Sequence, residues 1–211
     1  MNTRENAENR IRTVLLLRHA QTKFPDERKY CLGSRTDLPA DPAGLASAAA
    51  LAPLLAAHGV RSVWSSPMLR CRQTAGAIAG GLPVGVVPGL EELDCGDWDG
   101  LPFDEIKTRW PAHYARRGDD PALPPPGGEP PAHAAQRGLA ALRALLARTQ
   151  GDIAVVGHAG LSRAMLCALL GRPMSEQYAL PQPYLCVNIL HDDGAGLTVE
   201  TIGLSPKEVF P

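Results

Sequence analysis

The sequence predicts an α/β fold, a three-layer sandwich in which helices cover both faces of a mainly parallel central sheet. Three observations predict this fold. Short apolar runs alternate along the chain with longer segments rich in alanine and leucine. Runs such as Val14–Leu17 and Ile153–Val156 are apolar at every position, which is typical of strands covered on both faces. The length, 211 residues, suits one domain of ordinary size.

Short runs rich in apolar and β-branched residues predict five strands. They are Thr13–Leu17, Arg61–Trp64, Val84–Val87, Ile153–Val156 and Leu185–Leu190. Helices are expected between them. Asp41 and Pro42 form a helix start, and Gly59 ends the segment that follows. The expected helical segments are 42–57, 68–79, 102–116, 132–148 and 161–170. Because strands and helices alternate, we expect most strands to pair in parallel.

A loop with six prolines runs from Gly118 to Pro131. It is either a linker between two domains or a stiff surface loop. The chain continues only over residues 132–211 and contains one strong helix, one strong strand and little more, which favours a surface loop or lid. We therefore expect a single domain over 12–211, preceded by a flexible, polar tail over 1–11.

Composition argues against several classes of protein. The 21 basic and 22 acidic side chains leave a formal charge of −1, without the basic excess of a nucleic-acid-binding protein. No apolar run approaches the about 20 residues needed to cross a membrane. The polar N-terminus resembles no targeting peptide, so a cytoplasmic protein is expected. The five cysteines lack C-x-x-C spacing, which predicts free thiols, and no metal-ligand spacing occurs. We therefore expect neither a metal nor a cofactor.

Two histidines stand in the same local context. His19 follows one apolar run, and His158 follows another that leads directly into a helix. Ligands of open α/β sheets bind at the carboxyl ends of the strands, where helix N-termini offer N–H groups to anions. A single histidine would more often be a structural residue. Two at equivalent strand ends predict a functional site.

Two arginines accompany these histidines. Arg18 directly precedes His19, and the two can share a site only if the strand ends there, because neighbours in a strand point to opposite faces. Arg70 lies in the first turn of the helix after the second strand. Alone it would be a solvated helix arginine. Near a strand end with two histidines, an anion clamp is the better interpretation, because guanidinium groups bind two phosphate oxygens at once.

An acidic loop, Leu90–Gly100, follows the third strand. Its carboxylates are solvated, bind a divalent cation, or include a partly buried general acid. The sequence alone leaves these three interpretations open.

Four motifs make the chain resemble the histidine phosphatase superfamily, the phosphoglycerate mutase-like proteins. L-R-H-A-Q-T is similar to the family's R-H-G-[EQ]-T, and S-S-P-M-L-R-C-R-Q-T-A is similar to S-P-L-x-R-x-x-Q-T-A. E-L-D-C-G-D-W-D-G and V-V-G-H-A-G resemble E-x-D-x-G-x-W-E-G and V-[ST]-H-[AG]-G. The motifs occupy Leu17–Thr22, Ser65–Ala75, Glu92–Gly100 and Val155–Gly160, in the family's order.

The resemblance implies a phosphoglycerate mutase-like fold and a role for each matched residue. His19 resembles the nucleophile that becomes phosphohistidine, and Glu92 resembles the proton donor. The phosphate pocket is implied to contain Arg18, Arg70, His158, Thr22 and Ala159. The family's mechanism uses no metal.

The chain departs from the family's pattern at two positions near the expected phosphate. Pro25 stands where the family often has asparagine, and Pro130 stands where the P-G-G-E-S segment has serine. These departures place part of the secondary phosphate contact in question, but not the catalytic core.

A phosphatase acting on a small phosphorylated metabolite is the expected function, and its alternatives are a mutase-type phosphotransferase and a catalytically silent phosphate-binding scaffold. The stretch between Glu92 and His158 is shorter than the resemblance to mutases would imply. The size of the chain and its E-L-D-C-G-D-W-D-G motif resemble those of α-ribazole phosphatases and broad-specificity bacterial phosphatases. Basic residues of the loop 23–36 either meet a second acidic group of the substrate or are solvated; they are Lys23, Arg28, Lys29 and Arg35. The oligomeric state, monomer or homodimer, stays open.

Overall fold

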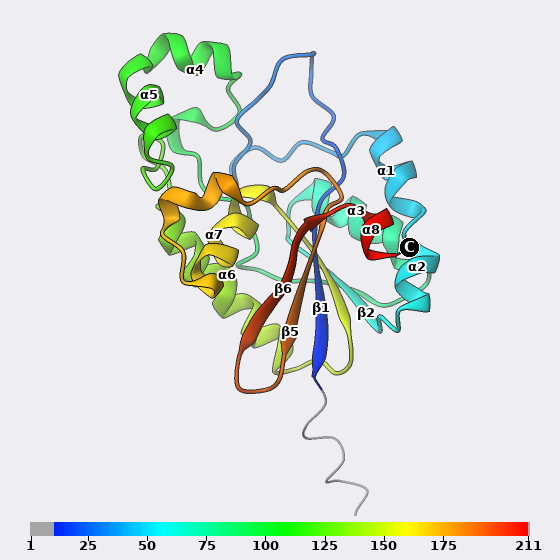
Figure 1. The fold of residues 1–211 in the computed structure, drawn as a ribbon. Coiled ribbons are helices and arrows are strands. Elements are labelled where there is room, and N and C mark those ends of the chain that lie inside the picture. Colours follow the sequence, from blue (N-terminus) through cyan, green and yellow to red (C-terminus); the bar gives the residue numbers. More distant parts are fainter. Residues whose placement is uncertain (1–10, 211) are drawn as a thin grey trace, which may run out of the picture.

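A six-stranded sheet in the order β3-β2-β4-β1-β5-β6 forms the centre of the molecule (Figure 1). The structure, a computed structural model, describes residues 11–210. β1 pairs in parallel with β4, β4 with β2 and β2 with β3, whereas β5 is antiparallel to both β1 and β6. The strands are β1 (Arg12–Arg18), β2 (Ser62–Ser65), β3 (Val84–Val86), β4 (Ile153–Gly157), β5 (Val187–Asp192) and β6 (Leu197–Leu204).

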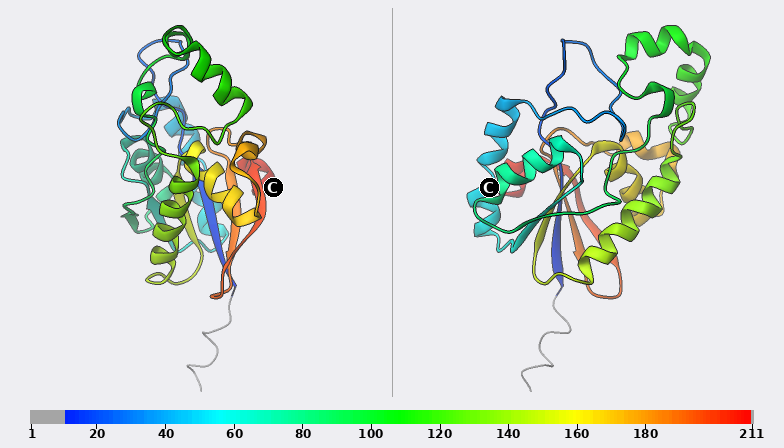
Figure 2. Two further views of the ribbon diagram at one scale, coloured as in Figure 1. Left: turned by 90° about the vertical axis from the view of Figure 1, so that its left-hand side faces the viewer. Right: turned by 180° about the vertical axis from the view of Figure 1, so that it is seen from behind.

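Helices cover both faces of this sheet, so the predicted three-layer α/β fold is confirmed (Figures 1 and 2). One face carries α1 (Pro42–Ala49), α2 (Ala52–Ala57), α3 (Leu69–Ala79) and α8 (Pro206–Val209). The other carries α6 (Pro131–Leu146) and α7 (Ala159–Leu170). Above the sheet lie α4 (Phe103–Arg109) and α5 (Pro111–Asp119), and two short 3-10 helices are η2 (Gly96–Trp98) and η3 (Met174–Ala179).

The continuous apolar runs are explained by burial on both faces. In β1, Leu15 and Leu17 pack against the α1–α3 layer, whereas Val14 and Leu16 pack against the α6–α7 layer. The four side chains are at most 5% exposed. Full burial of such a side chain contributes about 1.5–3 kcal/mol, which is why four successive apolar positions are stable in the middle of this strand.

Prolines divide two of the expected helices. The segment expected as one helix over 42–57 is α1 and α2, since Pro53 in the first turn of α2 cannot donate the hydrogen bond that would continue α1. Likewise, Pro111 divides the expected segment 102–116 into α4 and α5, and Trp110 between them leaves the helical conformation.

The sixth strand, β6, was not expected, and the predicted last strand begins two residues too early. β6 alternates intermediate and exposed positions at its start, so its apolar residues form no continuous run. Leu185 lies outside β5 because its φ of +59° bends the chain before the strand begins.

Two further expectations concern the ends of the chain and its cysteines. The flexible tail predicted for residues 1–11 lies, apart from Ile11, outside the described residues. All five cysteines carry free thiols, as expected. None of the helices described in 11–210 combines the length and the apolar composition that a membrane crossing requires.

Candidate active site

The histidines and arginines singled out in the sequence meet at the carboxyl ends of the parallel strands. β1 ends at Arg18, β2 leads into Ser66, and β4 leads into His158. A cavity of about 210 Å³ opens there, and its lining includes Arg18, His19, Thr22, Arg70, Glu92 and Ala159. Because β1 ends at Arg18, the chain turns and both Arg18 and His19 reach the same cavity.

His19 is held as a neutral imidazole in one tautomer. Its Nδ1 lies 2.7 Å from the carbonyl oxygen of Ala20, which can only accept a hydrogen bond, so Nδ1 carries the proton. Burial, followed by the charges of Arg70 and Arg18, lowers the pKa of His19 to about 3. At neutral pH its Nε2 therefore has a free lone pair, which a nucleophile requires.

Arg18 is fixed from two sides. Its guanidinium lies over the ring of Tyr184, with Cζ 3.7 Å from the ring centroid. Its Nη1 donates to the carbonyl of Gln182 at 2.5 Å. The same Tyr184 ring lies 5.7 Å from the His19 ring. Tyr184 and Gln182 were not predicted as site residues, because their closeness to Arg18 arises only from the turn that precedes β5.

Arg70 is buried, with 1% of its surface exposed. It donates to the carbonyls of Thr36 and Gly33 at 3.1 and 3.3 Å, and Asp37 lies 3.9 Å away. These bonds attach the first turn of α3 to the loop after β1. The guanidinium is therefore positioned by backbone oxygens before any ligand binds.

Three buried polar atoms of the cavity residues have no hydrogen-bond partner within residues 11–210: Nε of Arg18, Nε of Arg70 and Oγ1 of Thr22. A buried donor without a partner costs about 1–3 kcal/mol. All three can donate, and two belong to cations. This arrangement fits an oxyanion such as a phosphoryl group.

His158 lies beside His19, and its ring centroid is 5.3 Å from that of His19. It is fully buried behind the cavity wall, where its Nε2 hydrogen-bonds with Oγ of Ser66 at 2.8 Å and lies 3.4 Å from Sγ of Cys71. Burial, with the charge of Arg70, holds the pKa of His158 well below its ordinary value. His158, which was expected in the phosphate pocket, thus lies beside His19 but contacts Ser66 and does not line the cavity.

Glu92 connects the acidic loop to the start of α7. Its Oε2 accepts from the Gly160 N–H at 2.9 Å, and its Oε1 accepts from Leu161 and Leu93 at 2.7 and 2.9 Å. A side chain at position 160 would bring a Cβ within 2.7 Å of Oε1, so it would displace the carboxylate from this position. The carboxylate is 9% exposed and borders the cavity.

Other carboxylates of the acidic loop have structural partners. Glu91 accepts from the Gly89 N–H at 2.8 Å, and Asp94 pairs with Arg35 at 2.8 Å. Asp99 accepts from the backbone N–H groups of Gly33 and Arg35. Among the acidic residues of this loop, Glu92 is the one that lines the cavity. No three histidine, cysteine, aspartate or glutamate side chains within 11–210 are grouped to hold a metal ion.

The second motif stabilises the loop that carries His19. Thr74 Oγ1 accepts from the Ala20 N–H at 3.0 Å and donates to the Arg70 carbonyl at 2.7 Å. Gln73 Oε1 accepts from the Ala40 N–H at 2.8 Å. The motif thus provides Arg70 and also fixes the backbone beside His19.

The basic residues of the loop 23–36 are exposed and do not line the cavity. Arg28 pairs with Asp26, and Arg35 pairs with Asp94. The cavity instead includes Arg117 and Arg163, which the sequence reasoning missed.

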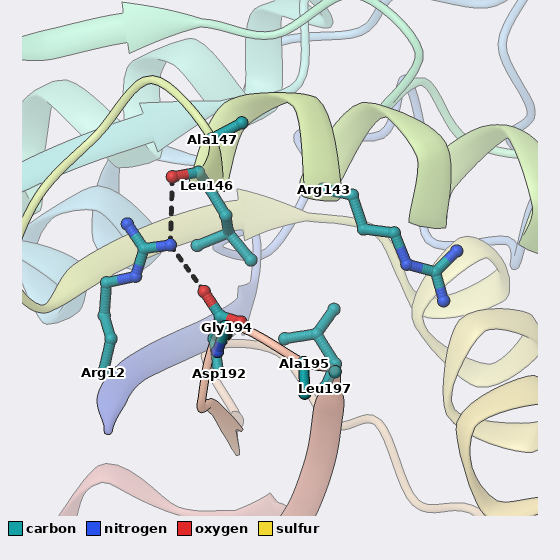
Figure 3. A pocket seen from close by; sticks show the side chains of 9 residues that line it. Arg12, Arg143, Leu146, Ala147, Asp192, Gly194, Ala195 and Leu197 are labelled. Carbon is teal, nitrogen blue, oxygen red and sulfur yellow. Dashed lines mark hydrogen bonds and ion pairs between the residues drawn. The ribbon is translucent and has the colours of Figure 1, made fainter. Parts of the chain in front are cut away.

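A second, separate cavity of about 320 Å³ lies at the other end of the strands, near the start of β1 and the turn between β5 and β6 (Figure 3). There the guanidinium of Arg12 donates to the Leu146 carbonyl at 2.9 Å and pairs with Asp192 at 2.5 Å. Its charge is therefore already balanced by the protein, whereas Arg18 of the first cavity forms no ion pair within residues 11–210.

The mostly parallel six-stranded sheet and the histidine site at its carboxyl edge define a phosphoglycerate mutase-like protein. The sequence matches the histidine phosphatase superfamily (branch 1) over residues 14–205, and the chain belongs to that family. It is a phosphatase of this family.

Among curated proteins, it is 31% identical to the glucosyl-3-phosphoglycerate phosphatase of Mycolicibacterium vanbaalenii, over 79% of this chain and 78% of that protein. It is 28% identical to phosphoserine phosphatase 1 of Hydrogenobacter thermophilus, over 84% of this chain and 85% of that protein.

Among solved structures, mycobacterial glucosyl-3-phosphoglycerate phosphatase matches with a TM-score of 0.81 and 25% identity, over 93% of this chain and all of that one. The α-ribazole phosphatase of Shigella flexneri shares the fold, with a TM-score of 0.74 and 21% identity over 91% of this chain and 96% of that one.

Proposed function

We propose that this chain hydrolyses the phosphomonoester of a small metabolite, without a metal, through a phosphohistidine formed on His19. The observation that carries this proposal is the state of His19. It is neutral, its Nδ1 donates to the Ala20 carbonyl, and it shares the cavity with two arginines whose Nε atoms have no partner among the described residues. Phosphomonoesters hydrolyse extremely slowly unaided, and a covalent intermediate divides the reaction into two easier displacements.

In the first step, His19 Nε2 attacks phosphorus, a P–N bond forms, and the P–O bond to the alcohol breaks. Glu92 gives its proton to the departing oxygen. Arg18 and Arg70 stabilise the charge on the other phosphoryl oxygens. In the second step, Glu92 removes a proton from water, the water oxygen attacks phosphorus, and the P–N bond breaks to release phosphate.

Glu92 must hold a proton when the first step begins. A phosphomonoester monoanion carries a proton of its own. We propose that substrate binding supplies the proton that Glu92 returns to the leaving group. In this proposal His158, hydrogen-bonded with Ser66, packs beside the nucleophile, and Thr22 and the N–H of Ala159 bind phosphate oxygens.

A quenched turnover experiment tests this proposal. Labelled p-nitrophenyl phosphate, mixed with the enzyme after exhaustive chelation of divalent ions, should give an acid-labile, alkali-stable adduct on the peptide that contains His19. His19→Ala should lose both the adduct and the activity. An adduct on His158 would reverse the two roles, and loss of activity on chelation with recovery on adding Mg²⁺ or Zn²⁺ would contradict the metal-free mechanism.

The finer substrate assignment needs a panel of phosphorylated metabolites, read by release of inorganic phosphate. α-Ribazole 5′-phosphate is one candidate, because the motif over Glu92–Gly100 resembles that of α-ribazole phosphatases. Glucosyl-3-phosphoglycerate is the other, from the relative that shares 31% identity. Release of free phosphate, as opposed to transfer to a second alcohol, also distinguishes a phosphatase from a mutase.

A further inference from the structure

Arg117 and Arg163 line the catalytic cavity together with the two arginines of the phosphate pocket. Both are half-buried. Within the described part of the chain, neither forms an ion pair, whereas Arg12, Arg35, Arg109 and Arg137 all do. A partly buried cation without a carboxylate partner is costly, so its presence at a ligand cavity indicates a ligand that supplies the negative charge.

The charges of the cavity do not balance with a phosphate alone. Its ionic side chains are four arginines and one carboxylate, that of Glu92, since His19 is neutral. Asp37, which lies 3.9 Å from Arg70, offsets one of the four positive charges. Glu92 and the bound phosphoryl group share one proton in the proposed mechanism, so together they carry two negative charges. One positive charge then remains, which a single carboxylate on the rest of the substrate would balance.

Arg163 is placed one helical turn beyond the phosphate end of the cavity. It lies four residues after Ala159 on α7, so the two share a face and are separated by about 6 Å along the helix. Its Nε donates to the Leu180 carbonyl at 3.0 Å, which fixes the guanidinium plane. The two terminal nitrogens are left to form a bidentate pair with a carboxylate.

Arg117 is attached to the same part of the wall. Its Nη1 donates to the carbonyl of Pro121 at 3.2 Å and also to that of Leu123. The Pro121 carbonyl accepts a second bond, at 2.8 Å, from Gln177 in η3, and η3 packs on α7. The proline-rich loop thereby holds Arg117 beside the helix that carries Arg163.

We propose that Arg163, assisted by Arg117, forms a second anion subsite that binds a carboxylate in the alcohol part of the substrate. The substrate class is then the phosphate esters of small hydroxy acids. This inference rests on the proposed function, because it assigns the alcohol side of the same cavity. α-Ribazole 5′-phosphate contains no carboxylate and falls outside this class.

Two compounds of nearly equal shape provide the test: 3-phosphoglycerate, and glycerol 3-phosphate, which has a hydroxymethyl group in place of the carboxylate. The wild type should show a kcat/KM for 3-phosphoglycerate about 10- to 100-fold above that for glycerol 3-phosphate, as expected for a charged hydrogen bond. Arg163→Met should abolish most of this preference, and Arg117→Met should reduce it. Arg143→Met, an exposed arginine at the other cavity, is the matched control and should preserve the preference (Figure 3).

Equal kcat/KM values for the two compounds in the wild type would overturn the subsite. So would an Arg163→Met variant that retains the preference, or one that loses both activities equally while still folding. A higher activity on fructose 1,6-bisphosphate than on 3-phosphoglycerate would replace the carboxylate by a second phosphate and also contradict the proposal. If the wild type hydrolyses none of these esters, nor p-nitrophenyl phosphate, the proposed function fails. Calorimetric binding of the same two compounds then decides the subsite separately, by the same preference and its loss in Arg163→Met.

Discussion

Three backbone N–H groups orient the carboxylate of Glu92, which makes this residue the clearest test of general acid catalysis. An alkyl alcohol leaves poorly unless it is protonated as the bond breaks, whereas p-nitrophenolate leaves without help. Glu92→Gln should therefore slow phosphorylation by alkyl phosphates about 10²–10⁴-fold, and by p-nitrophenyl phosphate much less. Burst kinetics isolate this first step from the second, which still needs a base.

The matched control for this change is Glu91→Gln, since Glu91 pairs with Arg137 and accepts from Gly89. It should leave the ratio of the two leaving groups unchanged. Equal loss for both leaving groups in Glu92→Gln would mean that the carboxylate only orients phosphate or the start of α7. Asp94 would then be the next candidate for the proton donor.

Cavity residues that belong to a short sequence motif could be predicted from the sequence. Cavity residues that a distant turn brings into contact could not. Arg18 ends β1, His19 follows it, and Arg70 lies in the first turn of α3. Glu92 lies in the loop after β3, and all four residues line the cavity. Arg163 follows His158 by five positions, and a helical count from Ala159 could have found it. Tyr184, by contrast, reaches Arg18 only through a turn whose centre, Leu185, has a positive φ, and no sequence pattern predicts that conformation.

At the scale of elements, buried strands were predictable, because burial on both faces leaves an unbroken apolar run. β6 escaped prediction because, at an edge of the sheet, it is partly exposed and carries polar residues such as Glu200. Pro53 and Pro111 were both visible in the sequence. Their effect was underestimated because the Ala/Leu content continues past them, while the missing N–H ends the helix.

Helix α6 and the acidic loop are joined by one side chain, Arg137. Its guanidinium pairs with Glu129 at 2.7 Å and donates to the carbonyls of Gly89 and Glu91 at 2.8 and 3.1 Å. It thus holds the peptide that leads into Glu92. Arg137→Met should lower the free energy of unfolding by about 1–3 kcal/mol, since it leaves several half-buried oxygens without their donor.

Chemical denaturation measures this loss, and burst kinetics with alkyl phosphates measure the accompanying displacement of Glu92. Arg137→Lys should recover part of both effects, because lysine keeps the positive charge but lacks the planar guanidinium that donates several hydrogen bonds at once. Arg143→Met, an exposed change on the same helix, should alter neither quantity. A stable Arg137→Met variant with normal phosphorylation of the enzyme by alkyl phosphates would show that the loop holds its shape without this contact.

At the scale of the whole molecule, the two buried histidines of the site should lower the free energy of unfolding in acid. Burial keeps His19 and His158 neutral, with pKa values below the ordinary 6.5, whereas both take up a proton in the unfolded chain near that pH. Below pH 6.5 the unfolded state thus binds more protons than the folded state. Stability is then complete above pH 6.5 and falls as the pH drops, by about 1.4 kcal/mol per pH unit for each histidine. For His19 this loss continues down to about pH 3.

Urea unfolding at several pH values between 7 and 5 measures this slope, in buffers free of phosphate so that no ligand stabilises the folded state. Carboxylates with lowered pKa values, such as Asp94, add a loss of the same sign at lower pH, so the wild-type slope alone does not isolate the histidines. His19→Gln removes one of the two groups and should flatten the slope by about one proton. His133→Gln, a change at an exposed position on α6, should leave it as in the wild type. If His19→Gln also keeps the wild-type slope, the imidazole takes up its proton in the folded protein near pH 6, and the nucleophile would then be charged, and inactive, under mildly acidic conditions.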